Sequence, residues 1–122
     1  MRFLVVDDSP TMRRILCNTL NEIGYDDLDE AEDGAQAWTK LTSDKFDFLI
    51  TDWNMPNMNG LELTKTVRGD SNLGEMPILM VTTRGMKDDV LAAMQAKVSN
   101  YVVKPFTAEI LRQKIDMVLE NI

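Results

Sequence analysis

Short apolar runs alternate with amphipathic segments along the whole chain, and this alternation constrains the fold more than any other feature. Runs such as Phe3–Val6, Phe46–Ile50 and Ile78–Val81 are rich in β-branched and aromatic side chains, which is typical of buried strands. The segments between them repeat apolar residues at helical spacing. The pattern predicts an α/β fold in which a parallel sheet is covered by helices on both faces.

We expect five strand–helix units within a single domain spanning residues 1–122. They are placed at residues 2–7 and 9–23, 27–31 and 34–43, 46–51 and 60–68, 77–82 and 86–96, and 100–103 and 107–121. Ser9 followed by Pro10 suits a helix start, Gly24 suits the end of that helix, and Asn59 with Glu62 resembles a capping box. The charged segment 27–31 fits a strand at the edge of the sheet.

Charge and residue usage exclude several classes of function. The chain contains no histidine and one cysteine, which excludes Ser-His hydrolysis, histidine-ligated zinc and an internal disulfide. Its net charge of −7 opposes binding to nucleic acid. No apolar run approaches the ~20 residues that cross a bilayer, and no signal peptide is recognisable. We therefore expect a cytoplasmic protein with no membrane insertion.

Polar side chains follow four of the five predicted strands. Asp7 and Asp8 come after the first strand, Asp52 after the third, Thr82 at the end of the fourth and Lys104 after the fifth. Each alone is better explained by an ordinary structural role, such as a helix cap, a turn residue or a solvated lysine. Because the carboxyl ends of parallel strands share one edge, where such folds bind ligands, the combination indicates a site.

Three carboxylates at one edge would repel one another unless a cation lies between them. A hard divalent ion with few protein ligands and several waters describes Mg²⁺. An ammonium from Lys104 and a hydroxyl from Thr82 would offset the charge of a phosphoryl group approaching the same carboxylates. Asp52 is then the candidate nucleophile.

Four motifs in this arrangement resemble the receiver domain of bacterial response regulators, in particular its stand-alone chemotaxis members. They are LVVDDS at residues 4–9, TDWNMPNMNG at residues 51–60, MVT at residues 80–82 and YVVKPF at residues 101–106. The resemblance covers the whole chain, in order. It implies a doubly wound, flavodoxin-like sheet of five parallel strands in the order 2-1-3-4-5.

The resemblance also implies a role for each residue at the strand ends. Asp52 would be phosphorylated by a histidine kinase, and Mg²⁺ would bind Asp8, Asp52 and the backbone carbonyl of Asn54, with Asp7 acting largely through water. Lys104 would bridge to the phosphoryl group. The protein would thus be a phosphoacceptor switch that catalyses its own phosphoryl transfer and dephosphorylation.

By the same resemblance, phosphorylation would draw Thr82 toward the phosphate and turn Tyr101 inward, with a cis bond before Pro105. The output face would lie on the fourth helix, fifth strand and fifth helix, at Lys87, Val90, Tyr101, Val103 and Lys114. Residues 84–118 carry a net charge of +2 against −8 for residues 1–83, which suits an acidic partner. A monomer acting on a flagellar motor switch protein is expected, with a phosphatase as a further partner.

Three residues depart from the usual receiver pattern, and two other functions stay open. Lys97 stands where many receivers have glycine, Thr83 where a smaller residue is usual, and Arg84 where chemotaxis members have an acid. A left-handed backbone at Lys97 would be strained by roughly 1 kcal/mol. The alternatives are a receiver in another phosphorelay and, with less support, a Mg²⁺-dependent phosphohydrolase with an aspartyl-phosphate intermediate.

Overall fold

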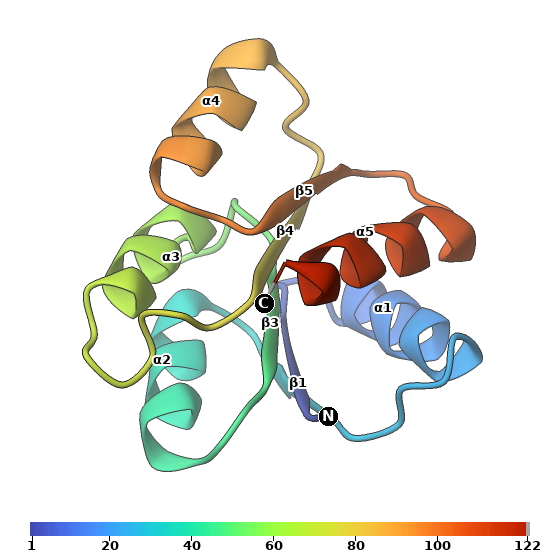
Figure 1. The fold of residues 1–122 in the computed structure, drawn as a ribbon, viewed down its shortest axis with the longest axis horizontal. Coiled ribbons are helices and arrows are strands. Elements are labelled where there is room, and N and C mark those ends of the chain that lie inside the picture. Colours follow the sequence, from blue (N-terminus) through green and yellow to red (C-terminus); the bar gives the residue numbers. More distant parts are fainter. Residues whose placement is uncertain (122) are drawn as a thin grey trace.

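The computed structural model describes residues 1–121, which form a five-stranded parallel sheet flanked by helices (Figure 1). In chain order the elements are β1 (Phe3–Val6), α1 (Pro10–Glu22), β2 (Leu28–Ala31), α2 (Gly34–Ser43), β3 (Phe48–Thr51), α3 (Gly60–Arg68), β4 (Ile78–Thr82), α4 (Lys87–Gln95), β5 (Asn100–Val103) and α5 (Ala108–Glu120). The predicted boundaries lie within two residues of these. No helix among the described residues is both long and apolar enough to cross a membrane.

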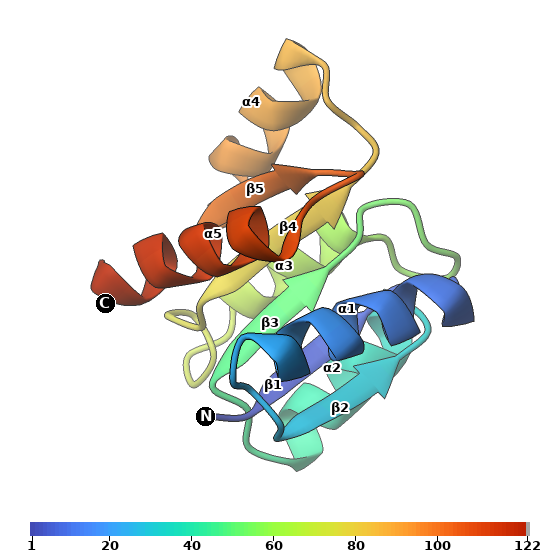
Figure 2. The ribbon, with the colours of Figure 1, turned by 90° about the vertical axis from the view of Figure 1, so that its right-hand side faces the viewer.

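The strands run in the order β2-β1-β3-β4-β5, which confirms the predicted topology. All neighbouring pairs are parallel, and the arrows in Figure 2 point the same way. In the register of the central strands, Val6 pairs with Thr51 and Thr51 with Met80. The chain therefore leaves β1 and β3 side by side, at the switch point where such sheets form a crevice beyond their carboxyl ends.

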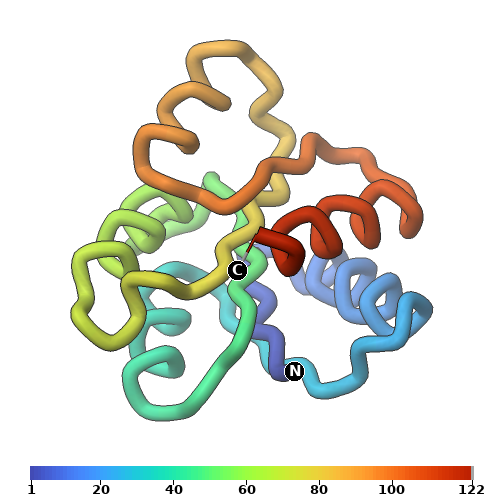
Figure 3. Tube along the Cα trace, viewed as in Figure 1, coloured from blue at the N-terminus to red at the C-terminus, as the bar shows by residue number. Residues whose placement is uncertain are grey.

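Helices cover both faces of the sheet, because successive strand residues point to opposite sides. In Figures 1 and 3, α1 and α5 lie on one face, and α2, α3 and α4 lie on the other. Within β1, Phe3 and Val5 pack toward the first layer and Leu4 and Val6 toward the second, all fully buried. Burying a side chain of this size stabilises the fold by about 1.5–3 kcal/mol. Two cores thus hold the strand ends rigidly in place.

The helices begin and end with the capping residues predicted from the sequence. The Ser9 hydroxyl accepts a hydrogen bond from the Met12 amide, and Gly24 takes a positive φ of 107° just after α1. The capping box between Asn59 and Glu62 is present at the start of α3. The cis bond expected between Lys104 and Pro105 is also present.

The end of α4 shows how this chain accommodates a lysine at the usual glycine position. Lys97 has φ +73°, a left-handed conformation that costs a side-chain-bearing residue roughly 1–2 kcal/mol. Its carbonyl accepts a hydrogen bond from Arg68 Nε at 2.8 Å. Arg68 also donates to the carbonyls of Gly74 and Met76, so one guanidinium fastens this turn to the loop that precedes β4.

Candidate functional site

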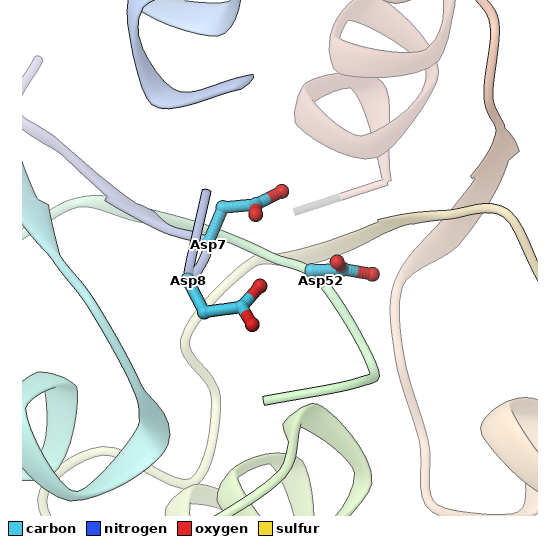
Figure 4. Close-up of side chains that lie close together, drawn as sticks. All are labelled: Asp7, Asp8 and Asp52. Atoms are coloured by element: carbon cyan, nitrogen blue, oxygen red, sulfur yellow. The ribbon is translucent and has the colours of Figure 1, made fainter. Parts of the chain in front are cut away.

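Three carboxylates meet beyond the carboxyl ends of β1 and β3. Ligand atoms of Asp7, Asp8 and Asp52 all lie within 4.8 Å of one another, and in Figure 4 the three carboxylates point to the same side. Asp7 is 1% exposed, Asp52 is half-buried and Asp8 is exposed. The cluster is therefore closed on the side of Asp7 and open to solvent at Asp8, where a ligand can enter.

Lys104 supplies the positive charge of the site. It follows β5 and reaches past β4, placing Nζ 2.8 Å from Asp7 Oδ2 and 3.3 Å from Asp52 Oδ2. The lysine side chain is 9% exposed, so these contacts lie in an environment that screens charge poorly. Three carboxylates against one ammonium leave a local excess of two negative charges. The donor set consists of hard oxygen ligands with one accessible member, which fits Mg²⁺.

The loop after β3 binds the Asp52 carboxylate through a backbone amide. The Trp53 amide donates to Asp52 Oδ1 at 2.6 Å, and the Gly60 amide donates to the Trp53 carbonyl at 2.8 Å. A Cβ at Gly60 would overlap the Asp52 carbonyl oxygen, so only glycine fits this approach. Asn54 is exposed in the same loop, two residues after Asp52.

Thr82 and Tyr101 are both buried, and both contact the backbone of Arg84. Thr82 Oγ1 accepts a hydrogen bond from the Arg84 amide at 3.3 Å, and the Tyr101 hydroxyl donates to the Arg84 carbonyl at 2.6 Å. Tyr101 is 7% exposed, so its ring lies inward. Burial, reinforced by the negative charge of Asp89, raises the pKa of the Tyr101 hydroxyl to about 12. The loop after β4 thus connects the site edge to β5.

The side chain of Arg84 lies against the loop after β3, next to the site. Its guanidinium lies 4.6 Å from the centre of the Trp53 ring, Nε donates to Asn54 Oδ1 at 3.0 Å, and Nη1 lies 3.3 Å from Asp89 Oδ1 in α4. Trp53 itself is 6% exposed and belongs to the core between the sheet and α2, α3 and α4. Arg84 therefore joins the loop after β3 to α4.

Arg13 is a contributor that the sequence analysis did not identify. Its Nη1 donates to the Asp7 carbonyl at 2.7 Å and its Nε contacts Glu30 Oε1 at 3.1 Å, with the side chain 12% exposed. The residue lies four positions after the helix cap Ser9, on the first turn of α1. Its place in the first turn of α1 could have predicted this contact, because that turn lies next to the end of β1.

The residues predicted for the output face are not all exposed. Lys87 and Val103 are exposed, Val90 and Lys114 are half-buried, and Tyr101 is buried. Apolar side chains in and next to α4 are exposed in the same region. They are Leu91 and Met94 in the helix and Met86 just before it. By contrast, a hollow beside the amino ends of β4 and β5, lined in part by Arg68 and Lys97, contains none of the predicted site residues.

Comparison with known proteins agrees with this arrangement. Residues 3–116 match the response regulator receiver domain. The chain is 56% identical over 120 residues to chemotaxis protein CheY1 of Helicobacter pylori, covering 98% of this chain and 97% of that protein.

Solved structures share the fold over almost the whole length. Chemotaxis response regulator CheY4 of Vibrio cholerae superposes with a TM-score of 0.88 at 36% identity, covering 96% of this chain and 97% of that one. The response regulator TrrA of Thermotoga maritima, solved in complex with Mg²⁺ and BeF, superposes with a TM-score of 0.83 at 34% identity over the same shares. With the acidic cluster and its lysine in place at the sheet edge, the chain belongs to the response regulator receiver domain family.

Proposed function

We propose that this chemotaxis-type response regulator accepts a phosphoryl group on Asp52 from a histidine kinase in the cytoplasm. The observation that carries the proposal is the contact of Lys104 Nζ with both Asp7 and Asp52, at 2.8 and 3.3 Å. An ammonium held between two carboxylates can bind a phosphoryl oxygen without moving far. Asp52 is the nucleophile because it contacts Lys104 and is partly exposed, whereas Asp7 is closed off from solvent.

The transfer is a displacement at phosphorus. A carboxylate oxygen of Asp52 forms the new P–O bond as the P–N bond of the donor phosphohistidine breaks, and the imidazole nitrogen keeps the electron pair. Lys104 offsets the negative charge of the phosphoryl oxygens as they approach. Thr82 stands at the end of β4, where its hydroxyl can leave the Arg84 amide and donate to the phosphoryl group.

Mg²⁺ would be held by the carboxylates of Asp8 and Asp52 and by the backbone carbonyl of Asn54, with Asp7 acting through water. The excess of two negative charges and the exposure of Asp8 support this set. When bound, Mg²⁺ supplies charge neutralisation to both the carboxylates and the phosphoryl oxygens. The relative TrrA was solved in complex with Mg²⁺ and BeF, which supports Mg²⁺ as the ion.

The output would pass through Arg84 to the face formed by α4, β5 and α5. Thr82 and Tyr101 bind the amide and the carbonyl of Arg84, so a shift of Thr82 changes the loop that the Tyr101 hydroxyl holds. The exposed apolar side chains of this face, with the exposed Lys87 beside them, suit an amphipathic segment of a partner. The partner we propose is a flagellar motor switch protein, and the likeness to chemotaxis proteins supports a role in chemotaxis.

Intact-mass measurement after incubation with acetyl phosphate and Mg²⁺ tests the proposal. We expect the mass of one added phosphoryl group, mapped to the peptide that contains Asp52. The Asp52→Asn variant should show no addition, and Asp26→Asn, which changes an exposed carboxylate elsewhere, should react like the parent. Phosphorylation that persists in Asp52→Asn would overturn the assignment of the nucleophile.

A further inference from the structure

Outside the acidic cluster, the carboxylate of Asp33 is buried, and both of its oxygens accept hydrogen bonds. Asp33 precedes α2 and is 6% exposed. Its Oδ1 accepts a hydrogen bond from the Gln36 amide, which caps the helix, and its Oδ2 accepts one from Asn57 Nδ2, both at 2.8 Å. The hydrogen bond from the Gln36 amide has the larger effect and that from Asn57 the smaller, and together they hold the pKa of Asp33 below its usual range. One oxygen therefore serves α2 and the other serves the loop after β3.

That loop is fixed at a second point next to the first. The Gly34 amide donates to the Met58 carbonyl at 2.9 Å, and a Cβ at Gly34 would lie 2.5 Å from the same oxygen. Asn57 has φ +67°, a left-handed conformation that asparagine tolerates better than most residues. The start of α2 thus holds two successive residues of the loop, in addition to the bond between Trp53 and Gly60.

We infer that Asp33 is a positioning residue for the metal site, acting through Asn57 on the backbone of Asn54. The inference rests on the proposed function, in which the Asn54 carbonyl is a ligand of Mg²⁺. Asn54 lies between the fixed residues Trp53 and Asn57 and is itself exposed. Mg²⁺ demands ligands at about 2.0–2.1 Å in near-octahedral geometry. A carbonyl on an exposed loop meets that demand when the loop is anchored on both sides.

The two oxygens of Asp33 allow its roles to be separated. Asp33→Asn keeps one oxygen for the helix cap but turns an amide N–H toward the amide of Asn57, so two donors face each other. Adding Asn57→Asp reverses the polarity of the pair, because residue 33 then donates and residue 57 accepts. The double variant has the same net charge as the parent. Rescue by the double variant would therefore identify the hydrogen bond and not the charge.

The test is a Mg²⁺ titration followed by the emission of Trp53, in a Trp38→Phe background so that one indole reports. We expect Asp33→Asn to raise the Kd for Mg²⁺ by about tenfold, the usual effect of losing a group that orients a metal ligand. The double variant should return the Kd to near the parent value. Glu32→Gln is the matched control, since Glu32 is exposed, adjacent in sequence and equal in charge.

Asn57→Gly is the second variant, which leaves the cap of α2 intact, permits the left-handed backbone and removes the amide donor. It should raise the Kd in the same way, so the inference is tested even if Asp33→Asn fails to fold. If both variants bind Mg²⁺ as tightly as Glu32→Gln, Asp33 has no positioning role, although the proposed function stands. If the parent itself gives a flat titration, the proposed metal site fails and the inference fails with it.

Discussion

Replacing Asp8 by asparagine should make the metal-free protein more stable, although it removes a residue of the site. Ligand atoms of Asp8, Asp7 and Asp52 lie within 4.8 Å of one another. At that separation two unit charges repel by about 3.5 kcal/mol with an effective dielectric constant of ~20, and by about 0.9 kcal/mol in bulk water. Lys104 contacts Asp7 and Asp52 directly, which leaves Asp8 the least compensated of the three.

The lower value applies more closely because Asp8 is exposed. Two repulsive pairs disappear in Asp8→Asn, and part of that gain is offset by the lost attraction to Lys104, so the net gain is about 1 kcal/mol. For a domain of this size such a gain raises Tm by about 4 °C. Added Mg²⁺ should reverse the order of stability, since a ligand at 100 times its Kd stabilises the parent by about 2.7 kcal/mol.

Urea unfolding in EDTA and in excess Mg²⁺ measures both effects. We expect Asp8→Asn to be more stable than the parent in EDTA and to respond little to Mg²⁺. Asp116→Asn, which neutralises an exposed carboxylate on α5, should follow the parent in both conditions. If Asp8→Asn is no more stable than the parent in EDTA, the carboxylates do not repel one another as the geometry requires.

Three further results are expected. Lys104→Met should destabilise the metal-free protein by about 3 kcal/mol in urea unfolding, because it leaves the buried carboxylate of Asp7 unpaired; an unchanged midpoint would contradict this. Since the folded pKa of Tyr101 is raised from 10.0 to about 12, its contribution to stability is complete below pH 10 and is lost as the pH rises toward 12. The parent should therefore lose more stability than Tyr101→Phe over that interval, and parallel curves would refute the shift. Lys97→Gly should be more stable than Lys97→Ala by about 1 kcal/mol, because only the first relieves the left-handed backbone; equal thermal midpoints would show that no strain is present.

Local sequence patterns predicted the alternation of strands and helices and the strand-end residues, whereas the strand order came from the family resemblance. Fully buried strands such as Phe3–Val6 require continuous apolar runs, and caps such as Ser9 depend on neighbours within the same turn. The strand ends then follow from topology, because parallel strands deliver Asp8, Asp52 and Lys104 to one edge. The edge strand β2 was also predicted correctly, since exposure permits its charged residues.

Contacts between loops could not be predicted in the same way. The bond between Asp33 and Asn57 joins residues 24 positions apart, and the path of the loop after β3 decides whether they meet. Arg84 was singled out as unusual, but its partners Trp53, Asn54 and Asp89 come from two different segments. Sequence spacing within one element carries no information about such distances, so these contacts emerge only from the folded structure.

If the topology gathers Asp8 and Asp52 around one divalent ion, with Lys104 beside them, the residues nearest that ion can be mapped. Paramagnetic broadening of backbone amide resonances by substoichiometric Mn²⁺, competed away by Mg²⁺, tests this arrangement most directly. We expect broadening to begin at residues 7–9, 52–54 and 104. Broadening centred instead on the acidic segment 26–33, or spread evenly over the surface, would contradict it.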